Sequence, residues 1–153
     1  MRKALALVAV AVTTAALLGW TGATASQKGS HRQVRDMRLV VKHGYFVDND
    51  PNGESGGDLF GSSGELRHLG HKVGKYSTAC TLSPPVGGQC QATVIFRSGG
   101  RLQLAGNINL QGTHNRLAIV GGTGRFRRAR GGVALRAVDN QGQVQHLHLT
   151  ILL

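Results

Sequence analysis

The sequence predicts an all-β domain of antiparallel strands. From residue 37 onwards, apolar residues recur with period two or in short unbroken runs, as is typical of strands. Hairpin-type turns rich in glycine and polar residues separate these runs. No window has the 3.6-residue period and the caps that indicate a helix. The predicted strands comprise residues 37–41, 75–82, 91–96, 101–109, 116–120, 132–138 and 143–152.

The arrangement of these strands stays open at this point. Evenly spaced antiparallel strands joined by short turns form either a two-sheet sandwich or a closed barrel, and only closure removes exposed strand edges. Residues 37–153 have the length of one ordinary domain. Residues 26–36 are polar and basic without an apolar period, so we interpret them as a flexible leader to this domain.

Residues 1–25 have the features of a cleaved signal peptide. Arg2 and Lys3 form a short basic region, an apolar run covers residues 4–18, and small residues at 23–25 suit a cleavage site. A transmembrane anchor is the alternative, but the run is shorter than the roughly 20 residues that a bilayer core needs. We therefore expect a secreted, extracellular protein with no membrane span after cleavage.

The two cysteines are predicted to form a disulfide. Cys80 and Cys90 are the only cysteines of the chain, and an oxidising compartment favours their pairing. Two prolines and two glycines lie between them, so the bridge is expected to staple the loop end of a hairpin. The spacing fits no common redox or zinc motif.

The chain is strongly basic. It has 18 Lys and Arg residues against 7 acidic ones, a formal net charge of +11. Such a charge favours anionic partners, and for a secreted protein these include cell-envelope polymers; a solvated basic surface is the alternative. Aromatic residues make up only 5% of the chain, which argues against nucleic acid as a partner because stacking side chains are missing.

A glycine-rich segment is predicted to form a structural turn between two strands. Gly121, Gly122 and Gly124 allow positive φ or a close approach of two chain segments. Thr123 can bond back to the turn backbone, and Phe126 is expected to re-enter the apolar layer. Phosphate binding is the alternative, but the segment lacks the residues that complete a phosphate-binding loop.

No metal or cofactor is predicted. His146 and His148 lie on one face of a strand, but the sequence offers no third ligand, so ordinary surface histidines are the preferred interpretation. The segment 48–54 begins like a calcium loop. Leu59 stands where such a loop closes with a glutamate, so a polar turn is the preferred interpretation.

Several motifs together resemble the allene oxide cyclase and dirigent superfamily. The glycine-rich turn with its following Phe126 is the most specific of them. The resemblance covers about residues 57–138 and implies an eight-stranded antiparallel β-barrel. The motifs comprise Gly57-Asp58-Leu59, Leu69-Gly70, Lys72-Val73-Gly74, Cys80, Phe96, Gly99, Leu102, Gly106, residues 118–126, Gly131 and Val133.

The resemblance also implies a class of function. Barrels of this size can hold one small ligand, so we expect a small apolar or aromatic molecule in the interior. The protein would guide a cofactor-free cyclisation, as an isomerase or cyclase does, or a dirigent-type coupling. Whether it is an enzyme stays open, and the alternative is a non-catalytic secreted protein that associates with anionic cell-envelope components. Members of this superfamily form dimers or trimers, which implies a homo-oligomer.

Five residues are candidates for the site. Asp58 matches a superfamily position, and its carboxylate would suit a general acid or base if burial raised its pKa. The alternative role for Asp58 is that of a hydrogen-bond acceptor in a turn. The other pocket candidates are Tyr45, Arg67, Lys72 and Tyr76.

Overall fold

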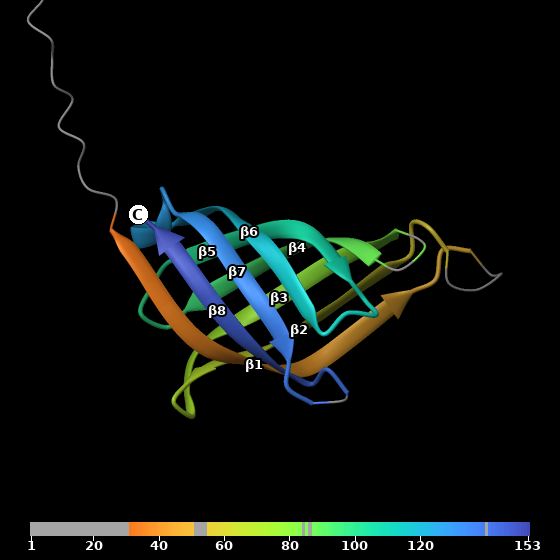
Figure 1. Cartoon of the computed structure of the whole chain (residues 1–153), viewed down its shortest axis with the longest axis horizontal. Helices are drawn as coiled ribbons and strands as arrows, with labels where there is room; N and C mark the ends of the chain where they lie inside the picture. Colours follow the sequence, from red (N-terminus) through yellow and green to blue (C-terminus); the bar gives the residue numbers. More distant parts are fainter. Residues whose placement is uncertain (1–30, 51–54, 84, 86, 140) are drawn as a thin grey trace, which may run out of the picture.

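The chain forms a closed barrel of eight antiparallel strands (Figure 1). The computed structural model describes residues 31–50, 55–83, 85, 87–139 and 141–153. Each strand pairs with its neighbours in chain order, and the last pairs with the first. The barrel implied by the resemblance is thus confirmed, and the sandwich is excluded. The elements are β1 (Arg32–Val47), β2 (Leu59–His68), β3 (His71–Ser83), β4 (Gly87–Phe96), β5 (Arg101–Asn109), β6 (His114–Thr123), η1 (Gly124–Phe126), β7 (Arg130–Ala137) and β8 (Val144–Leu152).

The first strand begins earlier than predicted. Residues 32–36, expected in the flexible leader, belong to β1 and pair with β8, from Arg32 opposite Leu152 to Asp36 opposite His148. Backbone hydrogen bonds to β8 hold this polar segment in the barrel. A search for alternating apolar residues cannot detect a strand that is held in this way. The predicted signal peptide, residues 1–25, lies outside the described residues.

Strand β2 is absent from the sequence prediction, which was wrong here. Its sequence, LFGSSGELRH, lacks alternating apolar residues because small residues, Ser62 and Gly64, occupy two of its inward positions. Gly64 is required by a close approach: a Cβ there would lie 2.0 Å from the carbonyl oxygen of Val40. The β2–β3 hairpin turns through Leu69 and Gly70, both with positive φ.

One half of the barrel interior is tightly packed. Phe126 contacts Phe96 with 5.0 Å between ring centroids, and the guanidinium of Arg125 lies 4.7 Å from the centroid of the Phe126 ring. Burying each such large apolar side chain contributes roughly 1.5–3 kcal/mol. The large apolar side chains that are entirely buried include Leu66, Leu102, Phe126, Leu149 and Ile151.

The glycine-rich segment closes this packed half, but its form differs from the predicted turn. β6 continues through Gly121, Gly122 and Thr123, and only then does the short helix η1 begin. Gly124 has a φ of 59°, and a Cβ on Gly122 would lie 2.3 Å from the carbonyl oxygen of Arg101. Phe126 is completely buried, so its predicted return to the apolar layer is confirmed.

The predicted disulfide is present. Cys80 of β3 and Cys90 of β4 are direct partners in the ladder, with Cα atoms 4.1 Å apart. The bridge crosses the hairpin near its loop end and faces the interior, where both cysteines are buried. Within the described part of the chain, no helix has the length and apolar character needed to cross a bilayer.

Candidate ligand cavity

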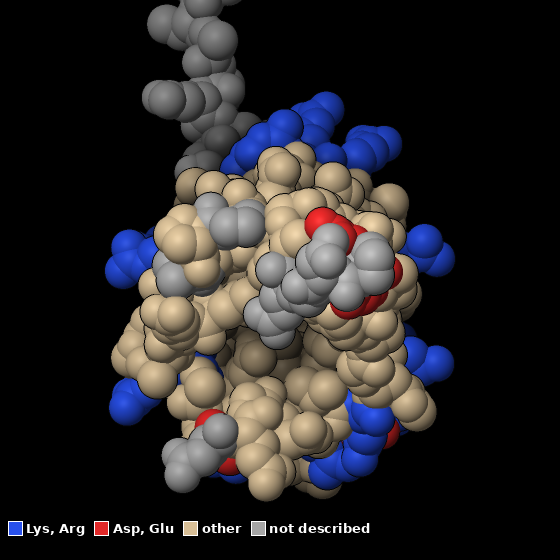
Figure 2. All heavy atoms as spheres, turned by 90° about the vertical axis from the view of Figure 1, so that its right-hand side faces the viewer, with Lys and Arg blue, Asp and Glu red and all other residues tan. Residues whose placement is uncertain are grey.

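The other half of the barrel interior is hollow. A cavity of about 250 Å³ lies there, and its wall includes side chains from β1 to β8. Its apolar lining includes Leu39, Phe60, Leu104, Leu117 and Leu147. Figure 2 views the barrel from this end and shows the hollow inside a ring of mostly uncharged side chains.

The cavity exists because neighbouring strands place small side chains side by side. Ser62 of β2 pairs with Thr78 of β3, Thr78 pairs with Ala92 of β4, and all three line the cavity. The next interior row of these two hairpins includes the disulfide between Cys80 and Cys90, which is also compact. Side chains of this size do not reach the barrel axis, so the space stays empty.

Tyr76 provides the most distinctive polar group of the cavity. Its side chain is 4% exposed, and its hydroxyl has no hydrogen-bond partner among the described residues. The ring lies against Gly64, where a Cβ would come within 3.0 Å of Cε1. Burial raises the pKa of the phenol, and the nearby Ser62 hydroxyl offsets this only in part. The phenol therefore stays protonated at neutral pH and can donate a hydrogen bond to a ligand.

The remaining polar groups of the wall are neutral. The hydroxyls of Ser62 and Thr78 lie 3.1 Å apart and bond to each other. Asn115 bonds to the backbone of Asn109, accepting at 2.7 Å and donating at 3.2 Å. No Asp, Glu, Lys, Arg or His is among the described residues that line the cavity. An uncharged ligand suits this wall, because a buried charge without a partner is costly.

Asp58 immediately precedes β2 and lies outside the cavity wall. Its two carboxylate oxygens accept hydrogen bonds from the backbone N–H of Asn49, at 2.9 Å, and of Ser55, at 2.7 Å. The Ser55 hydroxyl also donates, at 3.3 Å. The bonds from Ser55 and Asn49 lower the pKa of Asp58, although burial opposes them. A lowered pKa suits the turn-anchoring role better than general acid–base chemistry at neutral pH, and the catalytic role stays a prediction.

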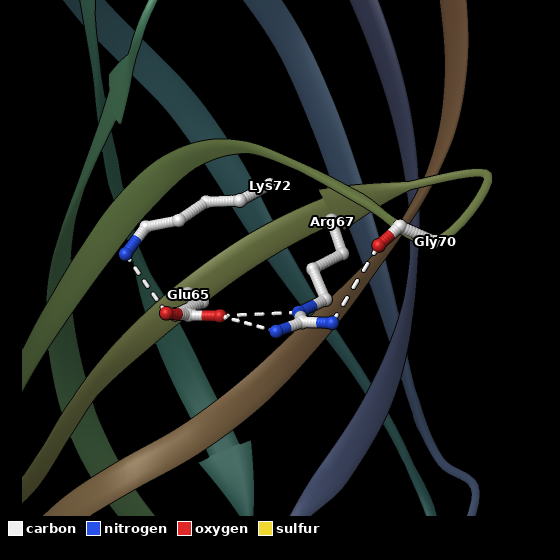
Figure 3. Close-up of polar contacts among 4 residues, drawn as sticks. All are labelled: Glu65, Arg67, Gly70 and Lys72. Carbon is white, nitrogen blue, oxygen red and sulfur yellow. Dashed lines mark hydrogen bonds and ion pairs between the residues drawn. The ribbon is translucent and has the colours of Figure 1, made fainter.

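Arg67 and Lys72 lie on the outer wall and bind the same carboxylate (Figure 3). Arg67 and Lys72 each approach Glu65 to 2.8 Å, and the Arg67 guanidinium also reaches the carbonyl oxygen of Gly70 at 3.5 Å. Hydrogen bonds from Lys72 and Arg67 lower the pKa of Glu65 from 4.5 to about 2. Neither cation lines the lumen cavity, although both were predicted as pocket residues.

Tyr45 also lies away from the cavity. It is 48% exposed on β1, and its ring covers Gly61 of β2, where a Cβ would meet the Tyr45 hydroxyl at 2.6 Å. Of the four weaker pocket candidates, the structure places only Tyr76 in the cavity wall. Sequence reasoning missed the small-residue row of Ser62, Thr78 and Ala92. The Gly-Ser-Ser-Gly string at 61–64 is its one visible signal.

The histidine pair lies on the outer wall of the barrel. Nδ1 of His148 lies 2.7 Å from an oxygen of Asp36 on the outer wall, and His146 is exposed on the same face. Among the described residues, no group of three His, Cys, Asp or Glu side chains could hold a metal ion. Part of the calcium-like segment, residues 51–54, lies outside the described residues.

A closed eight-stranded antiparallel β-barrel with a neutral interior cavity is the structural class of this chain. Within this class, the family model "Dirigent-like protein" matches residues 65–152, which is more than half of the chain. The chain therefore belongs to the dirigent-like protein family. Comparison with curated proteins finds no match.

Solved structures share the fold. A pterocarpan synthase dirigent protein superposes with a TM-score of 0.65 at 20% identity, covering 80% of this chain and 85% of its own. A pyocyanin demethylase gives 0.66 at 19% identity, covering 77% and 99%. The Diels-Alderase AbmU from Streptomyces koyangensis gives 0.63 at 14% identity, covering 84% and 71%. At these identities the likeness shows the barrel fold alone.

Proposed function

We propose that this dirigent-like barrel binds one small, neutral, apolar or aromatic molecule in its hollow half and holds it for a cofactor-free cyclisation or coupling. The observation that carries the proposal is the cavity of about 250 Å³ with an uncharged wall and one buried, unpartnered phenol. Its volume lies just below the range of about 300–1,000 Å³ for pockets that take drug-sized ligands. A molecule with a single ring and a short side chain is therefore the best fit.

The shape of the cavity and one hydrogen bond from Tyr76 would promote the reaction. An enclosed apolar wall restricts a flexible molecule to few conformations, and this lowers the entropic part of the barrier to ring closure or coupling. Tyr76 would donate a hydrogen bond to a ligand oxygen and so fix its orientation. The proposal needs no charged catalytic group in the wall. Two solved structures with the same fold are a pterocarpan synthase dirigent protein and a Diels-Alderase, and their names support a reaction of this general class.

We also propose that the protein acts outside the cell. The disulfide between Cys80 and Cys90 suits an oxidising compartment, and a secreted protein meets ligands that diffuse into its surroundings. The disulfide also forms part of the cavity wall, so oxidation would complete the binding site as well as the fold.

A matched pair of probes tests the binding proposal. Calorimetric titration with 4-propylphenol, which is neutral at pH 7, should give one site per chain. The anion 4-propylbenzoate has a similar shape and should bind that site at least about tenfold more weakly, because its charge would be buried without a partner. Equal binding of both probes, or binding of neither, contradicts a neutral site.

Two variants locate the site. Ala92→Leu adds bulk inside the cavity and should abolish 4-propylphenol binding. Tyr76→Phe keeps the ring but removes the donor, and should weaken binding about three- to tenfold, the cost of one neutral hydrogen bond. The control is Thr93→Leu, which places the same leucine side chain at the next residue of β4. Thr93 lies outside the cavity wall, so this variant should leave binding unchanged.

A further inference from the structure

The strand register places six basic side chains in one row across the outer wall. His114 pairs with Arg136, Arg136 with His146, and His146 with Arg38. Arg38 then pairs with Arg67, and Arg67 with Lys72. The row crosses β6, β7, β8, β1, β2 and β3 in succession. These residues are far apart in the sequence, and only barrel closure between β8 and β1 joins them into one feature, the basic row.

The basic row faces solvent. Leu135, Leu147 and Leu39 neighbour its members along β7, β8 and β1 and point into the barrel, so the alternating members point outward. Five of the six are exposed, and Arg67 is half-buried. Glu65 pairs with both Arg67 and Lys72 and offsets one of their two positive charges. Within the described residues, no ion pair or hydrogen bond engages the Arg38 and Arg136 side chains, so the middle of the row keeps its charge.

The shape of the row restricts its partner. Neighbouring strands lie about 4.8 Å apart, so six positions extend over roughly 24 Å. The row follows the curved wall over six of the eight strands. A flat membrane would touch only a few of its members at one time. A flexible linear chain can bend around the wall and meet them all.

We propose that the basic row binds a linear polyanion of the cell envelope, specifically a polyol-phosphate polymer. Phosphodiester groups repeat along such a chain, and each can contact a guanidinium by charge-assisted hydrogen bonds. Single-stranded nucleic acid is disfavoured because the row contains no Phe, Tyr or Trp for base stacking. This surface is separate from the lumen cavity, so binding of the polymer and of the small ligand are independent.

Purified poly(glycerol phosphate) is the probe that tests this surface. The double variant Arg38→Gln/Arg136→Gln removes the two guanidinium charges on either side of His146 in the row. The double variant Arg127→Gln/Arg128→Gln removes two exposed charges in the turn after η1. Both double variants lose the same net charge. The row variant should bind roughly tenfold more weakly than wild type at low salt, and its slope of log Kd against log salt should fall by about 1.4. The turn variant should match wild type.

Three outcomes would overturn the proposal. Equal weakening in the two double variants would mean that net charge, not the row, governs binding. No binding by the wild-type protein at low salt would remove the polymer as a partner. Stronger row-dependent binding to phosphatidylglycerol vesicles or to single-stranded DNA of matched charge would replace it with that partner. Titration with 4-propylphenol should be unaffected in the row variant, which separates this result from the proposal for the lumen.

Discussion

The two halves of the barrel interior differ although the same strands build both. At the η1 end, Leu66, Leu102 and Phe126 are completely buried parts of the hydrophobic core. At the other end, β2, β3 and β4 carry the small residues Ser62, Thr78 and Ala92, and the interior stays hollow. The difference shows that an interior cavity needs no change of fold. A row of small residues across three neighbouring strands lines the hollow half, while large apolar side chains fill the other half.

The matched variants Leu102→Ala and Leu104→Ala test this contrast most strongly. Both residues lie on β5, but Leu102 is in the packed half and Leu104 lines the cavity. Leu102→Ala should cost about 4–5 kcal/mol in free energy of unfolding, and Leu104→Ala only about 2–3 kcal/mol, because its loss enlarges a space that already exists. Urea unfolding measures both. Equal costs would mean that the two halves are packed alike.

Removing the disulfide should have the next largest effect on stability. Cys80→Ser/Cys90→Ser should lower the free energy of unfolding by about 2–3 kcal/mol, as expected for a loop of this length. The same variant should weaken 4-propylphenol binding, since the bridge is part of the cavity wall. Addition of a reductant to the wild-type protein provides a second measurement. If 4-propylphenol binding were unchanged in the variant and in the reduced wild-type protein, the disulfide would not be needed for the binding site.

Filling the two halves should have opposite consequences. Ala129 is completely buried at the η1 end and lies outside the cavity wall, whereas Ala92 lines the cavity. Ala129→Leu should destabilise the protein by about 1–3 kcal/mol through overpacking. Ala92→Leu should leave stability unchanged or raise it, because the new methyl groups occupy empty space. If Ala92→Leu destabilised the protein as much as Ala129→Leu, the space beside Ala92 could not be empty.

The smallest effect is expected outside the barrel interior, at Glu65. The pKa of this carboxyl falls from 4.5 to about 2 on folding, so its contribution to stability is complete above about pH 4.5 and is lost as the pH falls towards 2. Glu65→Gln should therefore flatten the fall in stability over that interval. Urea unfolding at pH 7, 4 and 2.5 measures the slope. An unchanged slope would mean that Lys72 and Arg67 do not hold the carboxylate in solution.

Most strands were predictable from the sequence because, in the packed half of the barrel, inward apolar residues alternate with outward polar ones. Residues such as Leu102 and Leu149 alternate with polar neighbours and reveal both their strand and its inward face. The strand β2 was not predicted because Ser62 and Gly64 occupy inward positions where apolar residues would have shown the two-residue period of a strand. Ser62 thus both contributes to the cavity and removes the apolar signal of its own strand. Closure of the barrel required the family resemblance, since pairing of β8 with β1 leaves no local signal.

The site was harder to predict than the fold. Tyr76 was a candidate and lies in the cavity wall, but Tyr45, Arg67 and Lys72 lie outside it. Charged residues attract attention as candidate catalysts, whereas here the described cavity wall is neutral. Which face a polar residue occupies depends on register, and the bulges between β1 and β2 and between β2 and β3 shift the alternation near these residues.

A crystal soaked with 4-bromophenol tests the central claim most directly, because anomalous scattering locates the bromine. The account predicts a bromine peak inside the hollow half, between Ala92 and Leu147, with the ligand hydroxyl bonded to that of Tyr76. The packed half should contain no peak. A lumen without bromine in crystals that hold the probe elsewhere, or a peak among Leu66, Leu102 and Phe126, would contradict it.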